Sequence, residues 1–324
     1  VNFDDRSWNV VSTPHTVELM PAEGSGCRNY QGPAWYRKHF VLPAETKGKR
    51  VVLHFEAAMG KQILYLNGKR IQEHLGGYLP FTLDLTANGV QAGDSCLLAV
   101  FTDNSDDKSY PPGKRQYTLD FAYHGGIYRD VWMIAKSPVA ITDAIDSQIV
   151  GGGGVFVHFD KISKKSAQVY VNTEVQNDDA RSESVTVETT LTDADGKVIK
   201  RSSGKLSLKP GEKKSIRQQM EVKNPTLWSP DTPYLYRVQS RIKKGNKSID
   251  GGITRVGIRL AEFRGKDGFW LNGKPFGQLV GANRHQDFAY VGNALPNSQQ
   301  WRDAKRLRDA GCTIIRVAHY PQDP

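Results

Sequence analysis

Near its carboxyl end the chain changes to a strand–helix–strand order, and this change limits the fold more than any other feature. Residues 278–282 and 313–317 are apolar runs of strand length, and the segment between them repeats apolar residues at helical spacing. Asn297 can cap that helix, with Gln300 at the capping-box position and Gly311 at the far end. Strands joined by a helix run parallel. We expect two buried strands that begin a further domain, because one such unit leaves its faces and edges open.

The sequence before this unit predicts short strands separated by turns. Asn67-Gly68 follows one apolar run and is the signal of a type I′ hairpin. Many short strands with turns between them are typical of a β-sandwich or jelly roll. The apolar runs are residues 51–55, 63–66, 97–101 and 131–134.

A second β-domain is predicted after the glycine run 151–154. Residues 169–175 alternate apolar and polar side chains, as in a half-buried antiparallel strand, and Asp195-Gly196 marks a hairpin. The segment has the length of an immunoglobulin-like sandwich but no cysteine pair. We therefore expect a mostly β, multidomain chain. Its parts are a jelly-roll-like β-sandwich (1–138), an immunoglobulin-like β-sandwich (139–257) and the start of an α/β barrel (258–324).

Composition excludes several classes of function. The net charge is +10, but the basic residues are scattered, which argues against a nucleic-acid-binding surface. No apolar run is long enough to cross a membrane. Cys27, Cys96 and Cys312 are far apart and odd in number, so they predict neither a disulfide framework nor a zinc site. The chain starts at Val1 without a signal pattern, so we expect that an N-terminal piece was removed; a periplasmic or secreted location is favoured over a cytoplasmic one.

Two histidines stand where an α/β barrel gathers its functional side chains. His285 follows the first strand of the strand–helix–strand unit and His319 follows the second. Neighbouring parallel strands would hold the two imidazoles side by side. Two alternatives stay open: both are ordinary loop histidines, or they bind a metal ion with Asp287, although no metal-ligand spacing supports this.

A charged residue and an aromatic loop add to this pattern. Arg316 lies inside an apolar strand, and a buried guanidinium needs a carboxylate partner. That partner would come from a part of the barrel outside this chain, or from an aspartate within it. Residues 119–130 mix aromatic, glycine and charged residues before a strand, which suits sugar binding, although an ordinary loop has the same composition.

Four motifs in order resemble glycoside hydrolase family 2 over essentially the whole chain. Residues 125–131, Gly-Gly-Ile-Tyr-Arg-Asp-Val, resemble the signature of its sugar-binding domain. Residues 228–236 resemble the end of its immunoglobulin-like domain. Residues 281–285 and 316–321 are similar to the first two barrel-strand motifs of its β-galactosidases.

The resemblance implies roles for particular residues. His285 and His319 fall on the two substrate-contacting histidines of the family, and Asp120 falls on a carboxylate that binds the glycone. Asn29 matches an asparagine of the same domain in a looser alignment. Arg316 falls on the arginine that orients the nucleophilic glutamate.

The same resemblance implies a retaining β-glycosidase that hydrolyses terminal non-reducing β-glycosides, with β-D-galactosides as the expected substrate. A β-glucuronidase or a β-mannosidase stays open. Retention needs two carboxyl groups about 5–5.5 Å apart, and the family's two glutamates would lie beyond Pro324. We therefore expect no catalytic residue in this chain and no activity from it alone.

Partners and cofactors follow from this interpretation. The expected partner is an oligosaccharide or β-glycoside substrate, and homo-oligomerisation stays open. No organic cofactor is implied, and a sodium or divalent ion near the site cannot be assigned to residues. A non-catalytic carbohydrate-binding module is the alternative from another class. The two are told apart by whether the reading frame continues into an Asn-Glu motif.

Overall fold

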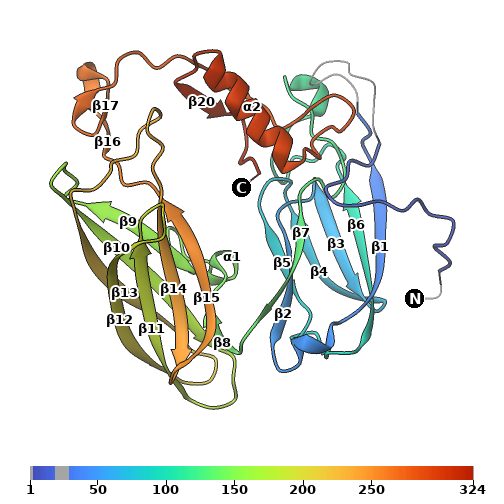
Figure 1. The fold of residues 1–324 in the computed structure, drawn as a ribbon. Helices are drawn as coiled ribbons and strands as arrows, with labels where there is room; N and C mark the ends of the chain where they lie inside the picture. Colours follow the sequence, from blue (N-terminus) through green and yellow to red (C-terminus); the bar gives the residue numbers. More distant parts are fainter. Residues whose placement is uncertain (1–2, 19–28, 324) are drawn as a thin grey trace. The chain divides into compact units, whose positions relative to one another are not determined.

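The computed structural model describes residues 3–18 and 29–323, which form two compact units (Figure 1). The first unit joins residues 1–135 with residues 280–324, and the second is residues 136–279. Each is mostly β, as predicted. The predicted domain boundaries at 138 and 257 stay predictions.

The first unit contains a sandwich of two sheets. The strands of the first sheet follow the order β1 (Pro33–Val41), β6 (Ser95–Asp103), β3 (Lys61–Leu66) and β4 (Lys69–Leu75). Every neighbouring pair in this sheet is antiparallel. The second sheet is in order β5 (Phe81–Asp84), β2 (Arg50–Phe55) and β7 (Val131–Lys136). Two 3₁₀ turns, η1 (Ala44–Thr46) and η2 (Gln116–Thr118), lie in its connections.

Alternate side chains along the strands are buried between the two sheets and stabilise this sandwich. Leu64 and Leu83 are fully buried and Val100 is 2% exposed, in a core formed by the inner faces of both sheets. The hairpin between β3 and β4 turns at Asn67 and Gly68, whose φ angles of 51° and 83° are those that a type I′ turn requires. The sandwich and this hairpin confirm the sequence prediction.

The strand–helix–strand unit belongs to the first compact unit. It consists of β19 (Gly281–Arg284), α2 (Asn297–Asp309) and β20 (Ile314–Val317), and the two strands pair parallel, as predicted. Within residues 1–324, β20 is exposed along its whole length and β19 is exposed except at Arg284, so the predicted burial is not seen in this part of the protein. Among the described residues each strand has one neighbour, and only the end of β19 is covered, where Arg284 pairs with Asp303 of α2 at 2.8 Å.

The start of helix α2 differs from the prediction by one residue. Asn297 is the first helical residue, and Pro296 occupies the cap with no side-chain hydrogen bond. The Pro296 carbonyl accepts from the backbone nitrogens of Gln299 at 2.8 Å and Gln300 at 3.3 Å, so the helix begins without an asparagine cap. Proline suits this place because its φ is fixed and it has no N–H to lose. Gly311 ends the helix with φ 88°, as predicted.

The second unit is a sandwich with a small additional sheet. Its first sheet consists of β8 (Val139–Ile141), β9 (Val155–Asp160), β10 (Ser166–Asn177) and β13 (Lys213–Lys223). Its second sheet is in order β12 (Val198–Leu208), β11 (Glu183–Thr192), β14 (Tyr236–Lys244) and β15 (Lys247–Val256). The remaining elements are α1 (Ala144–Ser147), β16 (Ala261–Phe263), η3 (Gly265–Asp267), β17 (Phe269–Leu271) and β18 (Lys274–Pro275).

The alternation predicted for residues 169–175 lies in β10. Val169, Val171, Thr173 and Val175 are all fully buried, which confirms a half-buried strand. Cys96 and Cys312 are free thiols, and Cys27 lies outside the described residues. In the described part of the chain, no helix is long and apolar enough to span a membrane.

Candidate functional site

A cavity of about 650 Å³ in the first unit contains two of the predicted site residues, Asp120 and His319. Three segments meet around it: the turn after β4, the long connection between β6 and β7, and the residues after β20. Its lining residues are Tyr78, Leu79, Pro111, Pro112, Lys114, Thr118, Leu119, Asp120, Phe121, His319, Tyr320 and Pro321.

Asp120 and His319 lie close together at this cavity. The Nε2 atom of His319 is 3.7 Å from Oδ1 of Asp120, and their side chains are 32% and 77% exposed. Asp120 lies in the β6–β7 connection, and His319 lies in the segment after β20. The two residues are 199 positions apart in sequence, so only the fold brings them together. An exposed carboxylate beside an imidazole offers both acceptors and a donor to hydroxyl groups of a ligand.

His285 lies beside His319, as the strand order predicts. The parallel pairing of Arg284 with Val317 brings the ends of β19 and β20 together, and the two imidazole centroids are 5.5 Å apart. The ring of Phe121 stacks on His285 at 5.5 Å and lies 5.6 Å from His319. Phe121 thus contacts both histidines from the sandwich, a contact that no local sequence pattern indicates.

Two stacked tyrosines form an apolar wall of the cavity. The rings of Tyr78 and Tyr320 are 4.5 Å apart and nearly parallel. Burial raises the pKa of Tyr320 to about 12, and its hydroxyl accepts a hydrogen bond from the Gln286 backbone nitrogen at 3.0 Å. Tyr320 therefore stays protonated over the physiological pH range, and this part of the wall carries no charge.

The connection that carries Asp120 is fixed by buried polar groups. Asn104 is 1% exposed, and its amide nitrogen donates to the Tyr123 carbonyl at 3.1 Å. The Tyr123 hydroxyl donates to Asp106, which also accepts from the Gln116 backbone nitrogen at 2.9 Å. Asn104 and Tyr123 are buried and Asp106 is exposed, and their hydrogen bonds together hold the connection in one conformation.

Asn29 and Arg316 lie away from the cavity lining. The Asn29 side-chain nitrogen donates to the Tyr123 carbonyl at 3.1 Å, so it contacts the connection that carries Asp120. Within residues 1–324 Arg316 is exposed, and its predicted pairing with a carboxylate stays a prediction. Its side chain is exposed and donates to Oδ1 of Asn283 at 3.4 Å, because the described elements leave this face of β20 uncovered. The substrate-binding role of Asn29 and the orienting role of Arg316 stay predictions.

The metal alternative gains no support from the geometry. Among the described residues, no group of three His, Cys, Asp or Glu side chains could hold a metal ion. Asp287 instead lies near His124, whose pKa it helps to raise against the larger effect of burial. Within the residues that the structure describes, the Nδ1 atom of His285 is buried without a hydrogen-bond partner.

His124 ties the sandwich to the segment after β19. Its backbone nitrogen and its ring Nδ1 both donate to Oδ1 of Asn293 at 2.8 Å. Asn293 is fully buried, and its side-chain nitrogen donates to the Gln286 carbonyl at 2.6 Å. This network connects the loop that follows Phe121 with the residue next to His285.

Protonation of His124 is expected to destabilise the fold, because burial disfavours the charged ring. Burial lowers the pKa of His124, so the unfolded chain binds its proton first and stability is lost as the pH falls below the ordinary value of 6.5. We expect His124→Gln to reduce the fall in Tm between about pH 7.5 and pH 5 by about 2–4 °C, the effect of about 1 kcal/mol in a domain of this size. Thermal unfolding at both pH values measures this. Parallel Tm–pH curves for wild type and variant would contradict it. Burial also lowers the pKa of His15 and His74. These two histidines contribute equally to the pH dependence of Tm in the wild type and in the variant.

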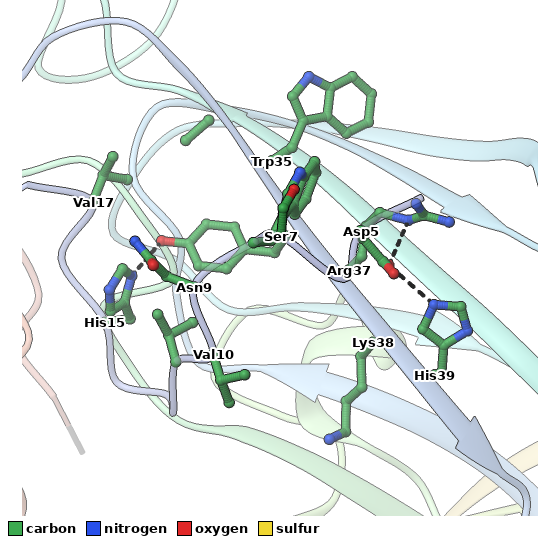
Figure 2. A pocket seen from close by; sticks show the side chains of 14 residues that line it. Asp5, Ser7, Asn9, Val10, His15, Val17, Trp35, Arg37, Lys38 and His39 are labelled. Atoms are coloured by element: carbon green, nitrogen blue, oxygen red, sulfur yellow. Dashed lines mark hydrogen bonds and ion pairs between the residues drawn. The ribbon is translucent and has the colours of Figure 1, made fainter. Parts of the chain in front are cut away.

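A second cavity, of about 700 Å³, lies between β1 and the N-terminal arm (Figure 2). Asp5 lies between Arg37 and His39 there, with Oδ2 3.3 Å from Nε of Arg37 and 3.0 Å from Nε2 of His39. The hydrogen bond from His39 lowers the pKa of Asp5. Asp5 is the one carboxylate in the cavity lining, so this cavity lacks the carboxyl pair that glycoside hydrolysis needs.

Comparison with known proteins accounts for nearly the whole chain. The model of the sugar binding domain of glycosyl hydrolases family 2 matches residues 3–138, a second model of that family matches residues 153–259, and that of its TIM barrel domain matches residues 263–324. The chain belongs to glycosyl hydrolase family 2. The resemblance drawn from the four sequence motifs is confirmed, and β19, α2 and β20 lie within the match to the TIM barrel domain.

Individual family 2 relatives are similar over the full chain. A β-galactosidase of Thermoanaerobacter pseudethanolicus is 34% identical over 99% of this chain and 41% of its own length. A β-glucuronidase of Formosa agariphila is 32% identical over 100% of this chain and 34% of its own length. The structure of Bacteroides uniformis β-glucuronidase 2, covalently bound to cyclophellitol-6-carboxylate aziridine, is 32% identical, with a TM-score of 0.88 over 99% of this chain and 37% of that one. The chain thus spans less than half the length of these relatives.

Proposed function

We propose that the whole protein hydrolyses terminal non-reducing β-glycosides by a retaining double displacement. β-D-Galactosides are the first candidate class of substrate. The observation that carries this proposal is the meeting of Asp120, His319 and His285 beside an aromatic wall. A pyranose has hydroxyls around its rim and an apolar face. Carboxylate and imidazole groups suit the hydroxyls, and aromatic rings suit the apolar face.

Residues 1–324 supply binding groups in this proposal. A retaining mechanism needs a nucleophile and an acid/base group about 5–5.5 Å apart. The cavity lining contains a single carboxylate, Asp120, and its side chain is 77% exposed beside His319. The reacting glutamates are therefore assigned to parts of the whole protein outside these residues, and the chain alone is inactive.

β-Glucuronides are the second candidate class of substrate. Lys114 lines the cavity with Asp120, and an ammonium group can pair with a sugar carboxylate. The Formosa relative is named a β-glucuronidase, and the ligand of the Bacteroides uniformis enzyme carries a carboxylate at its six position. These observations support a uronic acid as the glycone without favouring it over galactose.

The test compares the whole protein with residues 1–324 on chromogenic β-galactoside, β-glucuronide and β-mannoside, using the α-galactoside as control. We expect the whole protein to cleave the β-galactoside with retention and the short chain to cleave none of the substrates. NMR of the first-formed anomer of the released sugar measures retention. Cleavage by residues 1–324 alone would contradict the assignment of the glutamates. If the whole protein binds a sugar but cleaves none of the β-glycosides, a carbohydrate-binding function replaces the enzymatic one.

A further inference from the structure

Arg129 is a buried arginine that no role in the proposed site has yet explained. It lies two residues before the start of β7 and is 2% exposed. Removing a guanidinium from water costs several kcal/mol unless its donors are satisfied. Among the described residues, Nε of Arg129 is buried without a hydrogen-bond partner, whereas both terminal nitrogens donate. Nη1 donates to the Tyr78 carbonyl at 3.3 Å, and Nη2 donates to Oε1 of Gln286 at 3.2 Å and to the Pro321 carbonyl at 2.5 Å. The guanidinium also lies 5.2 Å from the centre of the Tyr128 ring.

The three acceptors of Arg129 come from the segments that surround the candidate site. Gln286 directly follows His285, and Pro321 lies two residues after His319. Tyr78 stacks on Tyr320 in the cavity wall. One side chain of the sandwich therefore holds both segments that carry the histidines.

Gln286 connects Arg129 to further residues near the histidine pair. It is fully buried, and its Oε1 atom accepts from Arg129 and, at 2.9 Å, from the Asp323 backbone nitrogen. Its own backbone nitrogen donates to the Tyr320 hydroxyl. A shift of the guanidinium would thus move the backbone on both sides of the histidine pair.

Contacts from the sandwich complement the pairing of the two strands. Within residues 1–324, β19 and β20 pair only with each other, and β20 is exposed. In this part of the protein, the position of the residues after the two strands therefore depends on contacts from outside their sheet.

We propose that Arg129 is a positioning residue that sets the places of His285 and His319 by binding Gln286 and Pro321 from the sandwich. The inference rests on the proposed function, in which these histidines contact the sugar. Misplacing a binding group by about 1 Å can cost about a hundredfold in rate, so a tie that holds both segments matters to the reaction.

Arg129→Lys in the whole protein tests this, because lysine keeps the charge but is a point donor that cannot span three acceptors. Arg37→Lys is the matched control. Arg37 is also a sandwich arginine with a side chain 7% exposed, and its partners, Phe3 and Asp5, belong to the N-terminal arm.

We expect both variants to lose a few degrees of Tm, and Arg129→Lys alone to raise KM and to lower kcat/KM by about 10–100-fold. A purely structural role would lower the amount of folded enzyme, and so kcat, at unchanged KM. An unchanged KM in Arg129→Lys, or an equal effect of Arg37→Lys, would overturn the proposal.

A second measurement does not depend on activity. In residues 1–324 with ¹³C-labelled histidine rings, we expect Arg129→Lys to shift the signals of His285 and His319, because the Phe121 ring current depends on its distance from both rings. Arg37→Lys should leave them in place, and His285→Gln and His319→Gln assign them.

This second measurement separates the two proposals. If the whole protein cleaves no glycoside, the proposed function fails while the ring signals still test the positioning. Unmoved signals in Arg129→Lys would overturn the positioning role whatever the activity. Should Arg129→Lys not fold, Gln286→Met removes one acceptor, keeps the arginine and must shift the His285 signal.

Discussion

Replacing His319 with alanine is expected to lower kcat/KM of the whole protein for its β-glycoside by about 10²–10³-fold, the usual effect of removing one donor that stabilises a transition state. His319 lines the cavity, lies 3.7 Å from Asp120 and keeps 32% of its side chain exposed, so it is accessible to a ligand. Its loss removes a polar contact while leaving the stacked pair Tyr78 and Tyr320 intact. Steady-state kinetics on the cleaved substrate measure the effect.

The control for this prediction is His39→Ala. His39 is on β1, with a side chain 63% exposed and paired with Asp5, and it lines the cavity at the N-terminal arm. We expect this variant to keep kcat/KM within about twofold, because most surface substitutions have small effects. Equal losses in both variants would show that histidine removal acts through stability, and full activity of His319→Ala would remove His319 from the site.

Gly60→Ala should be the most destabilising small substitution in the sandwich. Gly60 has φ 86°, and a Cβ there would lie 1.9 Å from the carbonyl oxygen of Asp103 and 2.9 Å from Cα of Asn104. Both neighbours are backbone atoms, so no side-chain rotation can relieve the clash. Left-handed backbone costs a non-glycine residue about 1–2 kcal/mol, and overpacking adds about 1–3 kcal/mol, so we expect a loss of about 3 kcal/mol or more.

Gly89→Ala separates these two contributions. Gly89 has a similar φ of 83°, but a Cβ there meets no atom within 4 Å. It should therefore cost only the conformational part, about 1–2 kcal/mol. Urea unfolding of residues 1–324 in both variants measures the difference. If the two glycines cost the same, the steric argument for Gly60 is wrong.

Local sequence patterns predicted the elements of the fold well, because each depends on near neighbours. Asn67-Gly68 predicts its hairpin since both residues tolerate positive φ, and residues 169–175 predict a half-buried strand since alternate side chains face opposite sides. Two features of the strand–helix–strand unit differ from these expectations. Pro296, rather than Asn297, caps helix α2, and the apolar strand β20 is exposed.

The histidine pair was partly predictable from the same patterns. Parallel strands joined by a helix place the ends of β19 and β20 together, so His285 and His319 become neighbours for a topological reason. Asp120 could be named only through the family motif, because its 199-residue separation from His319 carries no periodic signal. Its 3.7 Å approach to that histidine is a product of the fold.

From the sequence came several of the strands, the hairpin at Asn67-Gly68, the strand–helix–strand order and the family of this protein. The tertiary structure alone decided which faces meet around the cavity: Phe121 against both histidines, and Arg129 against Gln286 and Pro321, 157 and 192 residues away. The physical reason is that propensity and periodicity describe which side of an element is apolar. They do not describe which distant segment of the chain will satisfy a buried donor on it.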